Sequence, residues 1–268
     1  MPSTSSQWNA VVLAGERPGG SAFSRELGLP ASVLVDVAGR SALARVISTL
    51  ADCQRVTGGA LCGPSEDIFR NNEAFENILR DTEFEWLPPA ECPSASSLSA
   101  IQKINRYPVL LTAGDHALLT PALVDDFCTR ADHLDADVVV GLVPYDLVHQ
   151  AFPDSKRTVL KFSDGQYCGS NLFAVLNPRG EAAPAFWSRL EADRKRPWRM
   201  ARRVGPAMLF RYLFGQLTLE KGLQSLSSAM GCRVAMLRID DPRAAVDVDS
   251  VADRDLAESI INADQPAS

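Results

Sequence analysis

The sequence lacks several features that would assign it to a special class of protein. None of its apolar runs approaches the roughly 20 residues that a membrane-spanning helix needs. It also lacks an excess of positive charge, because its formal net charge is −6, and this disfavours non-specific binding of nucleic acid. Residues 1–7 contain no basic stretch followed by an apolar one. We therefore expect no signal peptide and a cytoplasmic protein.

The cysteines do not form the close pairs that are typical of zinc sites or redox motifs. No C-x-x-C spacing occurs among the six of them, which are Cys53, Cys62, Cys92, Cys128, Cys168 and Cys232. We interpret them as small buried side chains with reduced thiols, and not as a disulfide framework.

The first half of the sequence alternates apolar runs rich in β-branched residues with segments of helical period. The predicted strands are 9–14, 55–62, 84–87, 109–113 and 136–143. The predicted helices are 41–50, 66–79, 94–104 and 121–131, the last with Thr120 as N-cap. This alternation predicts right-handed βαβ units, and therefore a largely parallel sheet with helices on both faces. A length of 268 residues suits a single domain over 1–268.

The second half departs from that rhythm. Two strands, 158–162 and 167–176, are predicted around a turn, and they precede three helices. These helices are 181–193, 198–214 and 218–230, and we interpret 181–230 as a helical insertion. A strand at 233–239, a helix at 251–262 and a disordered tail at 263–268 complete the prediction.

In an open parallel sheet, ligands bind outside the carboxyl ends of the strands, and three polar clusters fall at such ends. The first is the glycine-bearing loop 15–20 after the first strand. Its glycines allow main-chain N–H groups to approach phosphate oxygens, and Arg17 supplies a forked cationic donor. A structural loop without a ligand is the alternative interpretation.

The second and third clusters are acidic. An apolar strand ends in Gly114-Asp115, which puts a carboxylate at the rim of the sheet, where Mg²⁺ would find an oxygen ligand. Asp115 as a turn or cap residue is the alternative, and His116 is interpreted as a packing or hydrogen-bonding neighbour. Further along, alternation puts Asp247 and Asp249 on one face of an extended segment. They are either a second source of metal carboxylates or, for Asp249, the cap of the following helix.

In this order, the three clusters resemble the MobA-like NTP transferases. The resemblance also includes residues 35–40 (VDVAGR) and the terminal DLAE of residues 255–258. It implies a three-layer α/β/α Rossmann-like (GT-A) fold. It also implies an enzyme that transfers an NMP from an NTP to a small sugar- or alcohol-phosphate with release of pyrophosphate, using Mg²⁺ or Mn²⁺.

The resemblance also implies roles for individual residues. The triphosphate would be held by Ala14, Gly15, Arg17, Gly19 and Gly20. Asp115, together with Asp249 or Asp247, would hold the metal, so that Arg17 and Asp115 are the candidate catalytic residues. Ser96 would contact the nucleobase. Gly169 and Asn171 would bind the acceptor, with a tight turn as the alternative for that segment.

One departure from the family pattern concerns charge. Members usually carry a lysine just before the Leu-Leu-x-Val-x-Gly segment, whereas this chain has Ser32 there and no lysine at all before Lys103. A hydroxyl cannot replace an ammonium group beside a polyphosphate, and the loss costs roughly a few kcal/mol of transition-state stabilisation. Arg25 or Arg40 would have to substitute for it. The alternative is a catalytically impaired protein that binds a nucleotide without turning it over.

Residues 189–211 concentrate positive charge, with eight basic and two acidic side chains, or +6. Aromatic residues lie within or beside this segment. Three interpretations stay open: a solvated basic face, a site for an anionic acceptor with Arg199 as a contact, and a helix over 189–214 at the inner face of a membrane. Nucleic acid is not an expected partner, and the sequence carries no prediction of oligomeric state.

Overall fold

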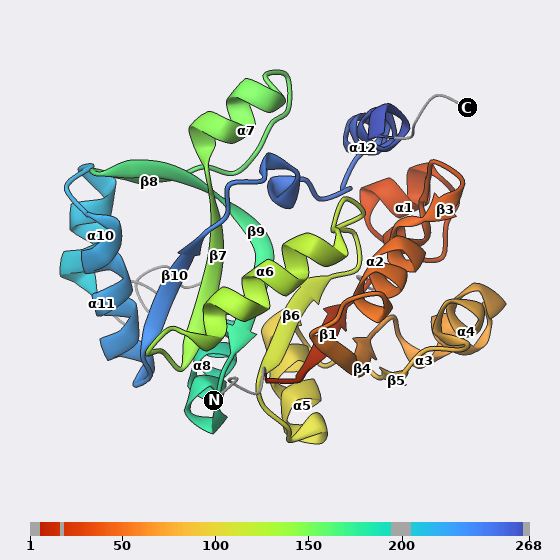
Figure 1. Cartoon of the computed structure of the whole chain (residues 1–268), viewed down its shortest axis with the longest axis horizontal. Coiled ribbons are helices and arrows are strands. Elements are labelled where there is room, and N and C mark those ends of the chain that lie inside the picture. Colours follow the sequence, from red (N-terminus) through yellow and green to blue (C-terminus); the bar gives the residue numbers. More distant parts are fainter. Residues whose placement is uncertain (1–5, 17–18, 194–204, 265–268) are drawn as a thin grey trace.

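The computed structural model describes residues 6–16, 19–193 and 205–264. Within them, eight strands form one sheet in the order β10-β7-β9-β6-β1-β4-β5, with β8 paired to β9 (Figure 1). These strands are β1 (Trp8–Leu13), β4 (Val56–Cys62), β5 (Phe84–Leu87), β6 (Val109–Ala113), β7 (Val138–Pro144), β8 (Leu160–Phe162), β9 (Gly165–Val175) and β10 (Val234–Arg238). A two-stranded hairpin, β2 (Asp36–Val37) and β3 (Arg40–Ser41), lies apart from it.

The sheet is mostly parallel, as the sequence predicts. Strand β1 pairs parallel with β4 and β6, and β10 pairs parallel with β7. Strand β9 lies between β6 and β7 and is antiparallel to both, so it is the reversed strand of the described sheet. The carboxyl ends of β1, β6, β7 and β10 consequently share one edge, and we call this edge the carboxyl edge.

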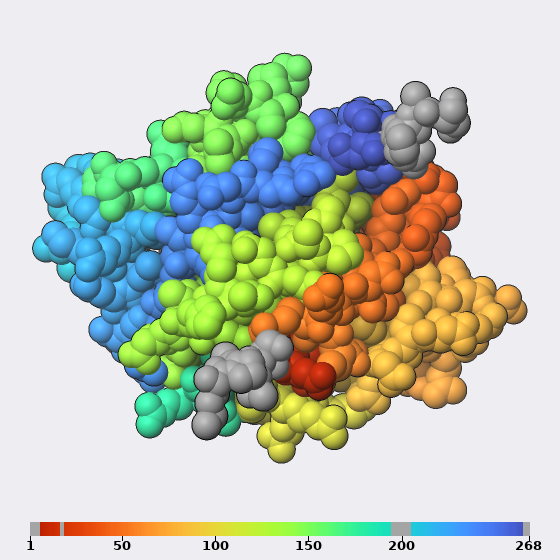
Figure 2. Space-filling view, in the orientation of Figure 1, coloured from red at the N-terminus to blue at the C-terminus, as the bar shows by residue number. Residues whose placement is uncertain are grey.

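Helices cover both faces of this sheet. They are α1 (Ala22–Glu26), α2 (Ala42–Ala51), α3 (Glu66–Arg70), α4 (Glu73–Leu79), α5 (Pro93–Ile104), α6 (Pro121–Asp132), α7 (Tyr145–Ala151), α8 (Ala182–Ala192), α10 (Pro206–Leu213), α11 (Leu219–Met230) and α12 (Val251–Asp264). Three short 3₁₀ turns are η1 (Ser32–Leu34), η2 (Pro178–Glu181) and η3 (Pro242–Ala245). Figure 2 shows α2 and α6 covering the central strands from one side.

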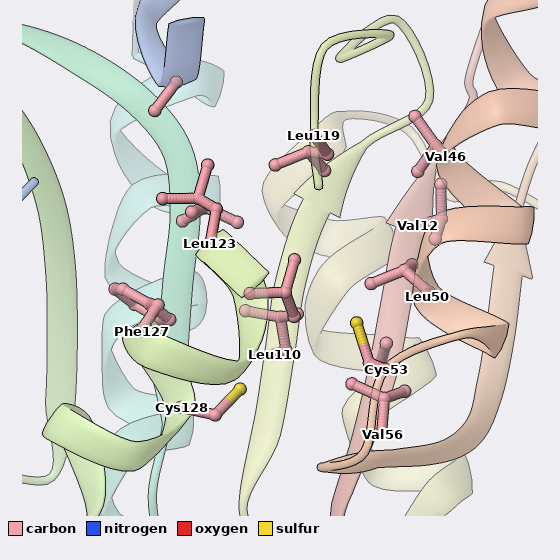
Figure 3. Packing of buried hydrophobic residues seen from close by; sticks show 14 of the residues in the cluster. Val12, Val46, Leu50, Cys53, Val56, Leu110, Leu119, Leu123, Phe127 and Cys128 are labelled. Carbon is pink, nitrogen blue, oxygen red and sulfur yellow. The ribbon is translucent and has the colours of Figure 1, made fainter. Parts of the chain in front are cut away.

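The core forms as two layers because side chains alternate along each strand. Val12 of β1, Leu50 of α2 and Phe127 of α6 belong to one buried cluster, and Figure 3 shows Leu110 between Phe127 and the other two in this view. Val11, the neighbouring residue, belongs to the opposite layer with Ile101 of α5. The fold is therefore a three-layer α/β/α sandwich.

The helices begin where the sequence provides caps. The Ser41 hydroxyl accepts a hydrogen bond from the Ala44 N–H at the start of α2, and the Thr120 hydroxyl accepts one from the Leu123 N–H at the start of α6. One predicted helix, 66–79, is instead two, because the Asn72 side chain caps α4 and the chain breaks before it.

Other boundaries also differ from the predictions. Helix α12 continues to Asp264, two residues into the segment predicted as a disordered tail, and residues 265–268 lie outside the described part. The predicted helix 198–214 is described only from residue 205 onward, where it forms α10. In the described part of the chain, no helix is both long and apolar enough to cross a membrane.

Candidate functional site

The glycine loop leaves the carboxyl end of β1 and turns back toward α1. Ala14 is buried, and its N–H donates to the Cys62 carbonyl at 2.9 Å. Gly19 and Gly20 adopt left-handed φ angles of 81° and 80°, which glycine adopts at little cost. Their carbonyls both accept hydrogen bonds from Arg25 Nη1 at 3.2 Å. Arg17, the predicted catalytic cation, lies outside the described residues.

An acidic side chain inside this loop has a contact that the sequence did not predict. Glu16 Oε1 accepts from the Ser21 N–H at 2.8 Å, and Glu16 Oε2 accepts from the Ser32 N–H at 2.6 Å. The carboxylate therefore joins the loop to η1. Ser32, which the resemblance aligns with a lysine usual in the family, donates its main-chain N–H to this carboxylate.

Ser32 and Asp115 lie at the same part of the carboxyl edge. A Cβ atom on Gly114 would come within 3.3 Å of Val33 Cγ1 and 3.4 Å of Ala14 Cβ, so Gly114 packs between η1 and the end of β1. The Gly114 N–H also donates to the Leu13 carbonyl at 2.8 Å. The glycine loop, Ser32 and the start of the Asp115 loop are thus neighbours at the carboxyl edge, as expected if the first two polar clusters belong to one site.

Asp115 has a carboxylate oxygen that is shielded from solvent. Among the described residues, no group donates a hydrogen bond to this atom, Oδ1. Burial raises the pKa of Asp115 to about 7, and the negative charges of Asp249 and Asp247 contribute in the same direction. The predicted acids of the second and third clusters therefore lie close enough to repel one another.

Two hydrogen bonds to main-chain carbonyls join the Asp115 loop to residues 244–248. The Val248 N–H donates to the Asp115 carbonyl at 3.1 Å. His116 Nε2 lies 2.8 Å from the Ala244 carbonyl, which only accepts, so Nε2 carries the hydrogen. Burial lowers the His116 pKa to about 4, and the ring is therefore neutral at pH 7. His116 is a hydrogen-bonding neighbour of the site, as interpreted from the sequence.

Asp247 and Asp249 have different surroundings. The buried guanidinium of Arg157 donates to Asp247 Oδ1 at 2.5 Å and to Asp253 Oδ1 at 2.6 Å. The helix-capping role considered for Asp249 belongs instead to Ser250, whose hydroxyl accepts from the Asp253 N–H at 3.2 Å. Arg157 escaped the sequence analysis because it is 90 residues away from Asp247 in the chain.

The carboxylates of Asp115 and Asp249 fit a divalent cation that is also bound by the phosphates of a substrate. Asp115 offers a shielded oxygen with no donor among the described residues, and a cation would relieve its repulsion from Asp249. In that same part of the chain, however, no three His, Cys, Asp or Glu side chains come together as a complete metal site. Mg²⁺ is commonly bound by one or two carboxylates together with substrate phosphates, and this edge offers that kind of partial site.

Ser96, the predicted base contact, has a structural role in α5. Its side chain is buried, and its hydroxyl accepts from the Ala90 N–H at 2.8 Å. The Cys62 thiol also approaches the Ser96 carbonyl at 3.7 Å. Ser96 therefore shapes the segment that leaves the carboxyl end of β5.

The Gly-Ser-Asn segment lies inside β9, in agreement with the predicted strand 167–176, and the alternative of a tight turn is wrong. The β7–β9 register shifts between Gly169 and Phe173, and Asn171 takes a left-handed φ of 51° in this bulge. The buried Ser170 hydroxyl donates to the Gly141 carbonyl at 2.8 Å. The β6–β9 pairing ends at Leu111 and Phe173, two residues after Asn171 along β9.

The C-terminal part of the basic segment lies in α10, which exposes several apolar side chains. On and after α10, the exposed fractions are 59% for Phe210, 72% for Leu213 and 62% for Phe214. The Phe210 and Phe214 rings lie 4.3 Å apart between centroids. Arg199, the predicted acceptor contact, lies outside the described residues.

Residues 10–163 match the model of the MobA-like NTP transferase domain. This is more than half of the 268-residue chain, and it includes the glycine loop, Ser32 and Asp115. The chain belongs to this family. A comparison with curated proteins found no match.

Solved structures share the fold of this MobA-like NTP transferase over nearly its whole length. A hypothetical transferase from Thermus thermophilus superposes with a TM-score of 0.77 at 24% identity, covering 92% of this chain and 99% of that one. CMP:2-keto-3-deoxy-manno-octonic acid synthetase complexed with CTP gives 0.60 at 12% identity, covering 97% and 100%. A putative glucose-1-phosphate thymidylyltransferase from Bacillus anthracis gives 0.61 at 8% identity, covering 97% and 98%.

Proposed function

We propose that this protein transfers an NMP from an NTP to a small phosphorylated sugar or alcohol and releases pyrophosphate. The observation that carries the proposal is the solvent-shielded Asp115 Oδ1, at the edge where the glycine loop and the 247–249 segment meet. Family membership supports the reaction class. The similar folds of a CTP-bound synthetase and of a putative sugar-phosphate thymidylyltransferase support the choice of substrates.

We propose Asp115 and Asp249 as the ligands of Mg²⁺ or Mn²⁺. Asp247 is the weaker candidate because its charge contributes less than that of Asp249 to the raised pKa of Asp115. A bound divalent ion supplies positive charge where the attack on the α-phosphorus builds negative charge. In this proposal the main-chain N–H groups of the glycine loop orient the triphosphate, and the Gly169–Asn171 bulge receives the acceptor.

Thermal stabilisation by nucleotides tests the proposal. With Mg²⁺ present, we expect at least one of ATP, CTP, GTP and UTP to raise Tm. A ligand at 100 times its Kd adds about 2.7 kcal/mol, or roughly 5–10 °C for a chain of this size. The same titration with EDTA is the control. If millimolar concentrations of all four nucleotides left Tm unchanged, the proposal would fail.

A second candidate function is nucleotide binding without turnover. Two observations favour it: Ser32 replaces the family lysine, and the Glu16 carboxylate bonds to the Ser32 N–H. Release of pyrophosphate from the stabilising NTP, measured with a set of sugar- and alcohol-phosphates, distinguishes the two functions. Stabilisation without pyrophosphate release would favour the binding protein.

We also propose that α10 contacts an anionic lipid surface at the inner face of the membrane. Its exposed apolar side chains adjoin a segment with a net charge of +6, and apolar and basic residues together are typical of interfacial helices. We expect the protein to co-sediment with vesicles that contain phosphatidylglycerol. The double variant Phe210→Ser/Leu213→Ser should bind these vesicles about tenfold more weakly. Phe173→Ser, an exposed aromatic on β9, is the matched control. Equal sedimentation of wild type and double variant would contradict the proposal.

A further inference from the structure

The Glu16 carboxylate joins two segments that both border the glycine loop. The Ser21 N–H, at the cap of α1, reaches Oε1, and the Ser32 N–H, at the first residue of η1, reaches Oε2. Both distances, 2.8 and 2.6 Å, are short, as hydrogen bonds to charged acceptors are, and such bonds are stronger than neutral ones. Each oxygen therefore has a main-chain donor of its own.

These two donors form an anion site that the protein fills itself. A carboxylate oxygen and a phosphate oxygen are the same kind of acceptor, and convergent main-chain N–H groups are what phosphate-binding loops provide. One N–H group cannot serve both acceptors at full strength. A phosphate that uses the Ser21 and Ser32 donors must consequently take them from Glu16.

The position of this contact connects it to the proposed triphosphate site. Ser32 precedes Val33, which packs against Gly114 beside Asp115. The nearest described cation bonded to the loop is Arg25, whose guanidinium holds the carbonyls of Gly19 and Gly20. The Glu16 carboxylate thus accepts a hydrogen bond from the main-chain N–H of Ser32, the position at which relatives usually carry a lysine.

We propose that Glu16 sets the nucleotide affinity of this protein by acting as an internal anion that the triphosphate displaces from the Ser21 and Ser32 N–H groups. The inference rests on the proposed function and identifies a residue that determines affinity within it. With the ligand absent, Glu16 satisfies both donors and holds the loop against η1. Removal of its charge leaves the donors available to phosphate, so Glu16 variants bind NTP more tightly than the wild type.

Calorimetric titration with ATP, CTP, GTP and UTP, each with Mg²⁺, tests this displacement. For the NTP that binds the wild type, we expect Glu16→Gln and Glu16→Ala to lower Kd about tenfold, the size of effect given by one hydrogen bond to a charged group. Glu26→Gln is the matched control, because it removes the same charge from the exposed end of α1 without touching either donor. The matching uncharged nucleoside should bind wild type and variants alike.

The outcomes separate the inference from the proposed function. If the wild type binds an NTP and both Glu16 variants bind it equally or less tightly, the displacement model is overturned and the proposed function stands. A gain as large in Glu26→Gln would also overturn it, because general electrostatics would then suffice. If no protein in the set binds any NTP, both fail. Glu16→Gln retains the shape of the contact, so it decides the matter even if Glu16→Ala does not fold.

Discussion

Asp115→Asn is expected to lower nucleotidyl transfer on the order of 10³-fold and, at the same time, to stabilise the folded protein above neutral pH. Activity falls because the amide removes the proposed charge that holds the cation near the reacting phosphorus. Stability rises because the wild type carries, beside Asp249, a buried carboxylate whose Oδ1 has no donor among the described residues. Function and stability therefore oppose each other at this residue.

The pH dependence of that stabilisation follows from the raised pKa. Folded Asp115 keeps its proton up to about pH 7, whereas the unfolded chain releases it near pH 3.8. Between these values the unfolded state binds fewer protons, so the free energy of unfolding falls by up to about 1.4 kcal/mol per pH unit. The amide side chain of the variant cannot ionise and escapes this fall. Over the roughly three pH units between these values, the variant should gain up to about 4 kcal/mol at pH 8 and little at pH 4.

Thermal melts at several pH values, with and without Mg²⁺, measure both effects. Added Mg²⁺ should raise the Tm of the wild type but leave that of Asp115→Asn unchanged. Asp240→Asn, an exposed acid with a side chain 67% accessible, is the control and should alter neither property. Full activity in Asp115→Asn would remove Asp115 from the metal-binding role.

Arg157→Ala is expected to be the most destabilising of the substitutions considered, at about 3–5 kcal/mol. The Arg157 side chain is only 6% exposed and binds both Asp247 and Asp253. Its removal leaves two partly buried carboxylates without their counter-charge next to Asp249 and Asp115. The substitution should also weaken NTP binding, because the 247–249 segment loses the contact that holds it at the carboxyl edge.

Chemical denaturation of Arg157→Ala and Arg130→Ala provides the comparison. Arg130 also pairs with an aspartate, Asp126, but its side chain is 43% exposed, and such surface pairs contribute about 0–1 kcal/mol. Arg157→Lys should lie between the wild type and Arg157→Ala, because an ammonium group cannot reach two carboxylates as a guanidinium does. Similar losses for Arg157→Ala and Arg130→Ala would show that burial adds nothing to the Arg157 contacts.

The sequence predicted those parts of the fold that depend on local pattern. Strands at 84–87 and 109–113 agree to the residue, because each is a short apolar run with clear ends. Because ligands bind at the carboxyl ends of parallel strands, the sequence predicted that Asp115 and the 247–249 segment lie at the same edge of the sheet.

Contacts that join distant segments could not be predicted in this way. No local pattern links Arg157 to Asp247, or Glu16 to the main chain of Ser32. The bulge at Asn171 was missed for a related reason, since its cause is the register with β7 on the neighbouring strand. In each case the deciding partner lies far away in the sequence, where spacing carries no information.

The reversed strand β9 has a consequence for how this chain completes its fold. Residues 165–175 fill the gap between β6 and β7, although both neighbours belong to the family-matched region that ends at residue 163. Until β9 emerges from the ribosome, each of those strands keeps an open edge, the kind of edge on which chains aggregate. The family-matched region 10–163 therefore cannot close its sheet before residues 165–175 are present.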